Sequence, residues 1–294
     1  MIGIFDSGFG GLAVFREIVR ALPKYDYIYL GDNARAPYGD LSQDVIYQYT
    51  QQAVDYLFTH DCNLIILACN TVSAEALRKL QQEYLPFKYP GKNVLGIIRP
   101  LSEIAASTSK NKNIAVLGTQ STINSNAYQV ELQEQDKNIQ VIQQACPLLV
   151  SLVEDSQEKT ESSQSVLHNY LAPLVGENFD TLILGCTHYS FFHDQIENFF
   201  KKRVKIIENG QSIAKKLTDY IKRHPAFGSR SASSLRPSGE VAQARGEFST
   251  MPTGRQENAE SKQRVFLTTG DSKKFDQAAK KFLGQTIISQ KIKL

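Results

Sequence analysis

The stretch LIILACNTVSAEAL, residues 64–77, has a counterpart in TLILGCTHYSFFHD, residues 181–194. In each copy a short apolar run ends in a cysteine, Cys69 or Cys186, and small polar residues and a helical pattern follow. A continuous apolar run is typical of a strand in a parallel sheet that helices cover on both faces. The two copies therefore predict two parallel strands that each present a thiol at the carboxyl end.

Similar apolar runs recur along the chain and alternate with amphipathic helical patterns. The predicted strands are residues 2–6, 27–32, 64–69, 94–98, 114–119, 181–186 and 205–209. The clearest helical patterns are LAVFREIVRAL and SQDVIYQYTQQAVDYLFTH, residues 12–22 and 42–60. This alternation predicts an α/β fold with parallel sheets.

A weak internal repeat divides the chain into two similar halves. IGIFDSGFGG, from Ile2, resembles IAVLGTQSTI, from Ile114, and IILACNT resembles LILGCTH. We therefore expect two similar parallel-sheet α/β lobes related by pseudo-symmetry, one of residues 1–97 with 207–294 and one of residues 98–206. Because open α/β sheets bind ligands at the carboxyl ends of their strands, the active site is expected in the cleft between the lobes.

The composition changes between residues 226 and 262, which are rich in Gly, Ser and Pro and lose apolar periodicity. Such a segment predicts a disordered insertion or linker. Its mixture of basic and acidic side chains favours a solvated linker over a nucleic-acid-binding tail. The following VFLTTGDSKKFDQAAKKFLG predicts a strand, a turn and a helix that docks onto one of the lobes.

The bulk composition excludes several classes of protein. With 294 residues, 41% hydrophobic and 21% charged, the chain is typical of a globular protein with two domains. Its apolar runs are too short for a membrane span and its N-terminus lacks the pattern of a signal peptide, so a cytoplasmic location is expected. A net charge of +3 does not indicate a nucleic-acid partner.

The four cysteines are expected to be free thiols in that reducing setting, and no metal-ligand spacing occurs. Cys69 and Cys186 each stand at the start of a predicted helix, where the helix dipole lowers the pKa of a thiol. His188 follows Cys186 by two residues and is placed to act as its proton partner. Cys62 and Cys146 lack this context and are interpreted as structural.

Two further motifs fit either a binding site or an ordinary turn. DSGFGG, from Asp6, follows a predicted strand and precedes a predicted helix, so its backbone N–H groups are placed to hold an anion. APYGD, residues 36–40, combines a proline that fixes a turn with a glycine that allows close backbone approach. Each motif gains meaning only if it faces the two cysteines.

Several motifs together give the chain a family resemblance. They are FDSGFGGLAVFREI, YLGDNARAPYG, ACNTVSA, GTQSTINSNAY, LVED and LILGCTHY. They occur in the order seen in glutamate racemases, of the cofactor-independent aspartate/glutamate racemase superfamily, and FLTTGD extends the match near the C-terminus. An ordered set of this kind is more specific than any one of its members.

The resemblance implies a reaction, a site and a role. Cys69 and Cys186 would be the two acid/base residues that convert L-glutamate to D-glutamate for peptidoglycan synthesis, with no cofactor, metal, nucleic acid or membrane. Glu154 would support the His188 side, and a homodimer is left open. The residues that would line the amino-acid site are Asp6, Ser7, Tyr38, Gly39, Asn70, Thr71, Thr119, Thr187 and His188.

Two other functions stay open at this stage. Racemisation removes the α-proton from one face of the carbon and returns a proton to the other, so two opposed acid/base groups suffice for aspartate or another amino acid as well. The choice among substrates depends on the length of the pocket. In a non-catalytic small-molecule-binding or thiol-sensing protein the cysteines would be redox-active or merely packed, and the matching contexts of Cys69 and Cys186 argue against this class.

Overall fold

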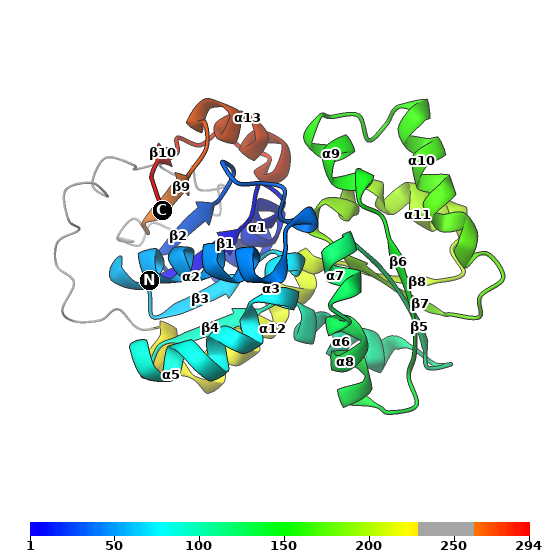
Figure 1. Ribbon diagram of the computed structural model, residues 1–294, viewed down its shortest axis with the longest axis horizontal. Coiled ribbons are helices and arrows are strands. Elements are labelled where there is room, and N and C mark those ends of the chain that lie inside the picture. Colours follow the sequence, from blue (N-terminus) through cyan, green and yellow to red (C-terminus); the bar gives the residue numbers. More distant parts are fainter. Residues whose placement is uncertain (229–261) are drawn as a thin grey trace, which may run out of the picture.

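The computed structural model of the chain describes residues 1–228 and 262–294. These residues form two sheets, and every strand pairing in the sheets is parallel (Figure 1). The first sheet has the order β10-β9-β2-β1-β3-β4. Its strands are β1 Ile2–Asp6, β2 Tyr27–Gly31, β3 Leu64–Leu67, β4 Asn93–Gly96, β9 Arg264–Thr268 and β10 Gln290–Lys291. The second sheet has the order β6-β5-β7-β8. Its strands are β5 Asn113–Gly118, β6 Gln140–Ala145, β7 Thr181–Gly185 and β8 Lys205–Ile207.

The two sheets share one topology, which confirms the repeat and the predicted fold class. The order β2-β1-β3-β4 of the first sheet recurs as β6-β5-β7-β8 in the second, so β1 corresponds to β5 and β3 to β7. We call each sheet with the helices that cover it the first or the second lobe. The lobe boundaries at residues 97 and 207 stay a prediction.

The helices fill the connections between strands (Figure 1). In the first half of the chain they are α1 Gly11–Ala21, α2 Gln43–Thr59, α3 Asn70–Glu75, α4 Leu77–Lys79, α5 Leu85–Lys88 and α6 Ile98–Thr108. In the remainder they are α7 Gln120–Asn124, α8 Ala127–Gln135, α9 Leu148–Glu154, α10 Glu161–Leu171, α11 His193–Phe199, α12 Asn209–Arg223 and α13 Ser272–Leu283. Short 3-10 turns span Tyr38–Asp40, Ala172–Leu174, Thr187–Phe192 and Pro225–Gly228, and a π turn spans Leu80–Tyr84.

Strand residues of the first sheet alternate between two buried faces. Ile4 on β1 lies in register with Tyr29 on β2 and with Ile66 on β3, and all three side chains join one hydrophobic cluster with residues of α1. Their neighbours Phe5 and Leu30 join a second cluster, beneath α2. Because both faces are apolar, these strands read as unbroken apolar runs in the sequence.

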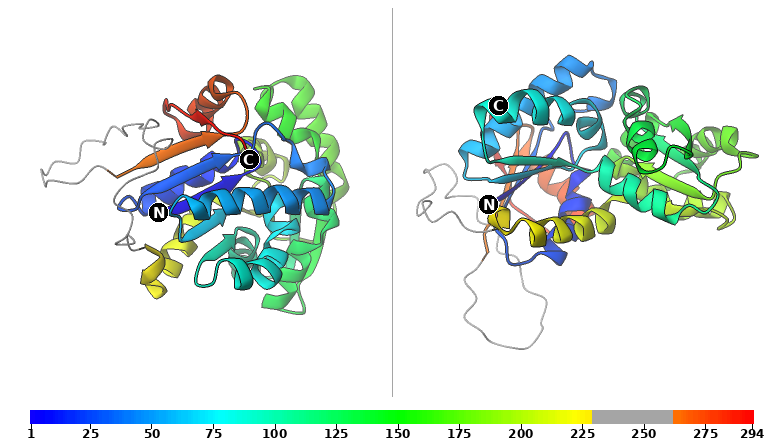
Figure 2. Two further views of the ribbon diagram at one scale, coloured as in Figure 1. Left: turned by 60° about the vertical axis from the view of Figure 1, so that its left-hand side comes forward. Right: turned by 90° about the horizontal axis from the view of Figure 1, so that it is seen from below.

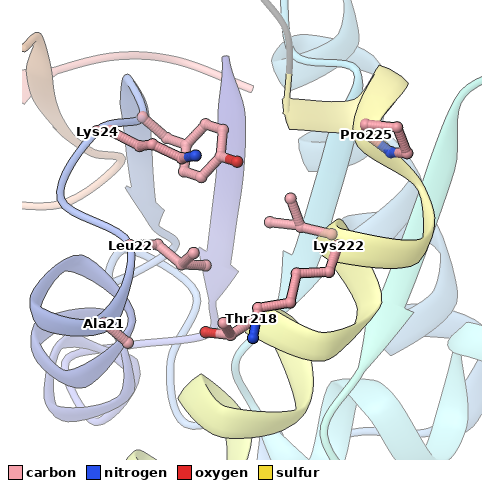
Figure 3. A pocket seen from close by; sticks show the side chains of 8 residues that line it. Ala21, Leu22, Lys24, Thr218, Lys222 and Pro225 are labelled. Carbon is pink, nitrogen blue, oxygen red and sulfur yellow. The ribbon is translucent and has the colours of Figure 1, made fainter.

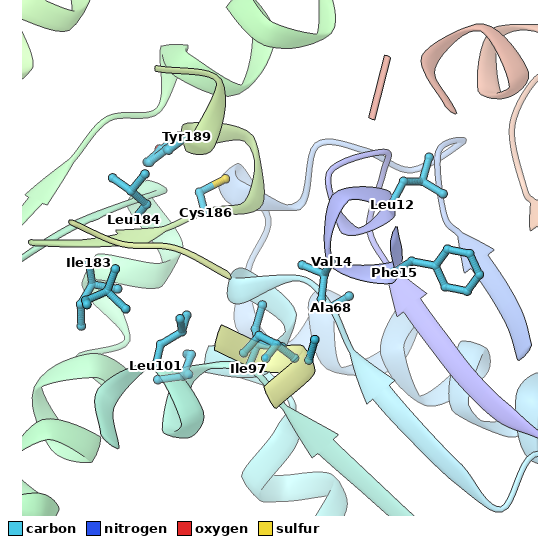
Figure 4. Close-up of a cluster of buried hydrophobic side chains, with 14 of the residues drawn as sticks. Leu12, Val14, Phe15, Ala68, Ile97, Leu101, Ile183, Leu184, Cys186 and Tyr189 are labelled. Carbon is cyan, nitrogen blue, oxygen red and sulfur yellow. The ribbon is translucent and has the colours of Figure 1, made fainter. Parts of the chain in front are cut away.

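The first of these clusters continues from one lobe into the other (Figure 4). Val14 of α1 and Ala68 after β3 belong to the same buried group as Leu101 of α6 and Ile183 of β7. Because close-packed interiors resist small displacements, the cluster fixes the position of one lobe relative to the other.

The C-terminal segment completes the first lobe (Figure 2). β9 pairs with β2 along its whole length, and α13 packs against α1. The predicted strand, turn and docked helix after residue 262 are therefore confirmed. Asp271 caps α13 by accepting a hydrogen bond from the backbone of Lys274 at 2.9 Å, and Gly284 ends it with a left-handed φ of 75°.

The insertion expected at residues 226–262 falls almost entirely outside the described residues. At its start, residues 226–228 belong to the 3-10 turn Pro225–Gly228 that follows α12. No helix within residues 1–228 and 262–294 is long and apolar enough to cross a membrane.

Candidate active site

The two thiols stand at matching places in the two lobes. Cys69 follows β3 and precedes α3, and Cys186 follows β7 directly. Both are free and nearly buried, with 8% and 6% of their surface exposed. The α-helix expected directly after Cys186 is a 3-10 helix, Thr187–Phe192, before α11 begins. Cys62 and Cys146 are fully buried, which fits the structural role expected for them.

The pKa values of the two thiols differ in direction from the expectation. Burial raises the pKa of Cys69 to about 11, and the nearby Asp6 carboxyl adds to this effect. Burial likewise raises the pKa of Cys186 well above its usual range. Backbone N–H groups at the helix starts, such as those of Thr71 and Val72 beside Cys69, act in the opposite direction but are outweighed. The prediction that the helix start lowers the thiol pKa was wrong. Loss of hydration destabilises the thiolate by more than the N–H groups at the helix start stabilise it.

Cys69 has a hydroxyl as its partner. The Sγ of Cys69 lies 3.3 Å from the Oγ of Ser7, in the turn after β1. The adjacent Asp6 is buried, and its Oδ2 accepts a hydrogen bond of 2.9 Å from the backbone of Gly8. Burial raises the pKa of Asp6, while the nearby His188 lowers it. The DSGFGG motif therefore faces Cys69.

Cys186 has an imidazole as its partner. The Sγ of Cys186 lies 3.8 Å from Nδ1 of His188, and Nε2 of the same ring lies 3.1 Å from Oε1 of Glu154. Glu154 is the last residue of α9, so this helix directs a carboxylate at the ring. Cys186, His188 and Glu154 therefore form a chain of contacts from thiol to imidazole to carboxylate. The contacts at both ring nitrogens keep the imidazole in one orientation.

The N-terminus of α1 lies against the Cys186 side. A Cβ built on Gly10 would stand 2.1 Å from Oγ1 of Thr187 and 2.7 Å from Nδ1 of His188. A Cβ on Gly8 would stand 3.4 Å from Oε1 of Glu154. At residue 10, therefore, only a glycine lets the first lobe approach this closely.

Amide and phenol groups join the strand ends of the two lobes. Tyr128 donates a hydrogen bond to Oδ1 of Asn70 at 2.6 Å, and Nδ2 of Asn70 donates to Oδ1 of Asn209 at 3.2 Å. Nδ2 of Asn209 in turn donates to the carbonyl oxygen of Leu184 at 2.8 Å. Asn70 directly follows Cys69, so this network fixes the position of the first thiol relative to β7.

Three threonines form a second contact between the lobes. Oγ1 of Thr71 lies 2.9 Å from Oγ1 of Thr119 and 3.2 Å from Oγ1 of Thr122. Gly39 lies against the same group, because a Cβ there would be 3.2 Å from Cβ of Thr119. These hydroxyl groups therefore meet where the loop after β2 reaches the second lobe.

The phenol of Tyr38 is held by another carboxylate. It donates its hydrogen to Oδ2 of Asp32, which also accepts from Nε of Arg35 at 2.6 Å. Oδ1 of Asp32 accepts from the hydroxyl of Thr269 at 2.6 Å. Tyr38 is buried, so the contact anchors the 36–40 loop to the segment after β9.

A comparison with known families identifies the architecture. The Asp/Glu/Hydantoin racemase model matches residues 2–217 of the chain. The chain belongs to this racemase family.

Individual relatives agree with the family match. A glutamate racemase of Sulfurihydrogenibium sp. (strain YO3AOP1) is 42% identical over 74% of this chain and 81% of its own length. One of Lactobacillus acidophilus is 34% identical over 99% of this chain and 96% of its own length.

Among solved structures, a glutamate racemase isoform from Bacillus anthracis has a TM-score of 0.83 at 32% identity, and the match covers 100% of this chain and 97% of that one. The enzyme from Francisella tularensis, solved in complex with D-glutamate, has a TM-score of 0.81 at 27% identity, with coverage of 99% and 97%.

The racemase fold brings the residues predicted for the site together near the carboxyl ends of β1, β3, β5 and β7, where the two lobes face each other, and Glu154 joins them from the end of α9. Sequence reasoning missed several partners that hold them in place: Asp32, Thr122, Tyr128 and Asn209. Asp32 and Asn209 follow β2 and β8, so the rule that ligand-site residues follow parallel strands would have indicated them. Thr122 and Tyr128 lie within GTQSTINSNAY, and no local sequence pattern indicates that their side chains belong to the site.

A separate open groove of about 590 Å³ lies elsewhere in this racemase-family chain (Figure 3). It runs between the segment from Ala21 to Tyr25, at the end of α1, and the end of α12 near Lys222 and Pro225. Neither thiol nor any of their partners lines it. Its residues therefore contribute nothing to acid/base chemistry at the strand ends.

Proposed function

We propose that this protein interconverts L- and D-glutamate by two-base proton transfer between Cys69 and Cys186, without a cofactor. The observation that carries the proposal is the pair of nearly buried free thiols at equivalent strand ends, each with its own polar partner. Proteins of this family with similarity over nearly the whole chain are named glutamate racemases, which favours glutamate as the substrate.

The proton balance of the reaction needs one thiolate and one thiol at a time. The thiolate removes the α-proton and becomes a thiol, and the electron pair of the broken C–H bond remains on the α-carbon beside the carboxylate. The opposite thiol then protonates the other face and becomes the thiolate. The reverse direction exchanges the two roles, so an enzyme that has completed one turnover is primed for the opposite enantiomer.

The burial of the thiols sets the main energetic problem. At pH 7 a thiol whose pKa is about 11 is thiolate in only about one molecule in 10⁴. An amino acid carries an ammonium group next to its α-carbon, and a positive charge close to a buried thiol favours the thiolate. We infer that the substrate itself promotes formation of the base that attacks it.

The partners of the two thiols have different roles. The hydroxyl of Ser7 donates a hydrogen bond that stabilises the thiolate of Cys69. His188, which Glu154 orients, takes a proton from Cys186 and returns it. The hydroxyls of Thr71, Thr119 and Thr187 supply donors for the carboxylates of the substrate. Fixed donors in a site that excludes water stabilise the negative charge that develops on deprotonation.

The product suggests a cellular role. D-Glutamate is a building block of peptidoglycan, so we propose that the protein supplies it in the cytoplasm for synthesis of the cell wall. Expression of the chain in a bacterial strain that needs added D-glutamate should remove this need, and a Cys69→Ser variant should not.

The decisive experiment follows both faces of the α-carbon at once. Purified, reduced protein is incubated with L-glutamate in heavy water without pyridoxal phosphate or added metal. We expect deuterium at the α-carbon by NMR and a racemic mixture by chiral chromatography.

Two outcomes would redirect the proposal. Exchange and racemisation of aspartate but not of glutamate would retain the two-thiol reaction and change the substrate. Absence of exchange with either amino acid, in protein whose thiols titrate as reduced, would favour a thiol-sensing or binding function.

A further inference from the structure

The end of α13 reaches from the first lobe to the helix that carries Glu154. Nζ of Lys281 donates hydrogen bonds to the carbonyl oxygen of Val153 at 2.7 Å and to Oε2 of Glu158 at 2.9 Å. The side chains of this ion pair are only 23% and 10% exposed. Val153 directly precedes Glu154, so the ammonium group fixes the last turn of α9.

The next residue of α13, Phe282, packs against the imidazole of His188. The ring of Phe282 packs edge to face on His188, with a centroid distance of 5.5 Å and an angle of 80°. It also packs on Phe191 at 4.9 Å, and Nζ of Lys281 lies 5.0 Å from the centroid of that same ring. Because Phe282 is 2% exposed, the imidazole has little freedom to rotate away from Cys186.

The helix itself is anchored in the first lobe. Phe275 packs against Phe9 and Tyr29 at 5.9 and 6.0 Å, and Arg16 of α1 donates a hydrogen bond to the carbonyl oxygen of Phe282 at 3.1 Å. An element held this firmly can position side chains of the opposite lobe.

On the basis of the proposed racemase function, we propose that Lys281 and Phe282 are positioning residues for proton transfer at Cys186. Lys281 fixes the backbone next to Glu154, and Phe282 fixes the face of His188. Both contacts lie on the Cys186 side, whereas Cys69 depends on Ser7. Loss of either contact should slow proton removal by Cys186 and leave proton removal by Cys69 nearly unchanged.

Overall racemisation cannot reveal this asymmetry, because each turnover needs both thiols. The test therefore uses the two enantiomers of threo-3-chloroglutamate, which have opposite configurations at the α-carbon. Removal of the α-proton with departure of chloride gives an enamine, which tautomerises and hydrolyses to 2-oxoglutarate and ammonium. Each enantiomer needs only the thiol that faces its α-proton, and Cys69→Ser and Cys186→Ser variants establish which enantiomer belongs to which thiol.

The variants are Lys281→Met, which keeps the stem and removes the charge, and Phe282→Leu, which keeps an apolar side chain without the ring. For each we expect a loss of about tenfold in ammonium release from the enantiomer that Cys186 deprotonates, since small misplacements of a proton-transfer group are costly. The other enantiomer should change less than about twofold. Lys281→Arg should restore the rate, and Lys280→Met, at the exposed neighbouring lysine, is the matched control.

Equal slowing of both enantiomers would mean a structural role and would overturn the proposal, as would unchanged rates in both variants. If Lys281→Met fails to fold, as judged by its circular dichroism and melting temperature, Phe282→Leu decides by the same criterion. Failure of the unmodified protein to racemise glutamate would instead count against the proposed function, so the two failures are distinguishable.

Discussion

Cys69 and Cys186 occupy the same place in two copies of one topology, yet their surroundings differ. Cys69 has the hydroxyl of Ser7 at 3.3 Å, whereas Cys186 has the imidazole of His188 at 3.8 Å, and Glu154 holds that ring from behind. A hydroxyl mainly offers a hydrogen bond, whereas an imidazole can also take part in proton transfer. The repeat therefore supplies two equivalent thiols, and the loops after β1 and β7 give each thiol a different partner.

The largest expected effect concerns the thiols themselves. Replacing Cys69 or Cys186 by Ser should lower the rate of glutamate racemisation about 10²- to 10⁴-fold, because one face of the α-carbon loses its acid/base group. Each variant should still release chloride from one enantiomer of threo-3-chloroglutamate, the two variants from opposite enantiomers.

Cys62→Ser serves as the control, since this thiol is fully buried and lies at the opposite end of β3 from Cys69. It should keep the activity of the unmodified protein. If both active-site variants favoured the same enantiomer, the two-thiol mechanism would have to be abandoned.

A smaller loss is expected where the first lobe touches the Cys186 side. The Cβ of Gly10→Ala would stand 2.1 Å from Oγ1 of Thr187 and 2.7 Å from Nδ1 of His188, so these two side chains or the segments that carry them would have to move. We expect a decrease of about 10²-fold in kcat/KM, the scale associated with misplacement by about 1 Å. Gly8→Ala is the matched comparison, because its Cβ would meet Glu154 only at 3.4 Å. An equal loss in both variants would show that the close approach at residue 10 is unimportant.

The two partners of the thiols should differ in which proton transfer they support. His188→Asn should lower racemisation about 10- to 100-fold, because an amide cannot replace an imidazole in proton transfer at Cys186. Ser7→Ala should lower the rate about tenfold, by loss of one hydrogen bond to Cys69. With the two enantiomers of threo-3-chloroglutamate, His188→Asn should mainly slow ammonium release from the enantiomer that Cys186 deprotonates, and Ser7→Ala should mainly slow release from the other. The opposite pattern would reverse the comparison.

The smallest effect is one in which the two sites should behave alike. Burial raises the pKa of both thiols, so the unfolded chain releases their protons at lower pH than the folded protein does. The stability that the protonated Cys69 contributes is therefore complete below about pH 9 and is lost as the pH rises toward about 11, by on the order of 2 kcal/mol. Cys186 acts in the same direction. Urea midpoints at pH 7 and pH 10.5 should differ less in Cys69→Ser than in the unmodified protein. An identical difference would indicate that Cys69 is more hydrated than the structure shows.

Much of this architecture could be predicted because its strands are covered on both faces. Runs such as LILGC are apolar without interruption, which separates a covered parallel strand from a surface element. β6, with the sequence QVIQQA, was missed because it is a partly exposed edge strand that carries polar residues. The repeat of strand, cysteine and polar turn also predicted the two matching thiols.

The sequence was less informative about what surrounds each side chain. Proximity to a helix start is visible in the chain, but burial depends on the opposite lobe, and burial decides the direction of the thiol pKa values. The link between Tyr38 and Asp32 likewise depends on a loop that folds back on itself. The contacts of Lys281 and Phe282 with the second lobe join residues more than 90 positions apart, and no local pattern indicates them.

The position of β9 has a consequence for how the protein is made. β9 pairs with β2, but the ribosome synthesises the two strands far apart in time, tens of seconds at about 5–20 residues per second. The second sheet, residues 113–207, is contiguous and can close while the chain is still attached. The lobe that begins to emerge first is thus completed last, and until then β2 offers an open edge on which nascent chains can pair with one another.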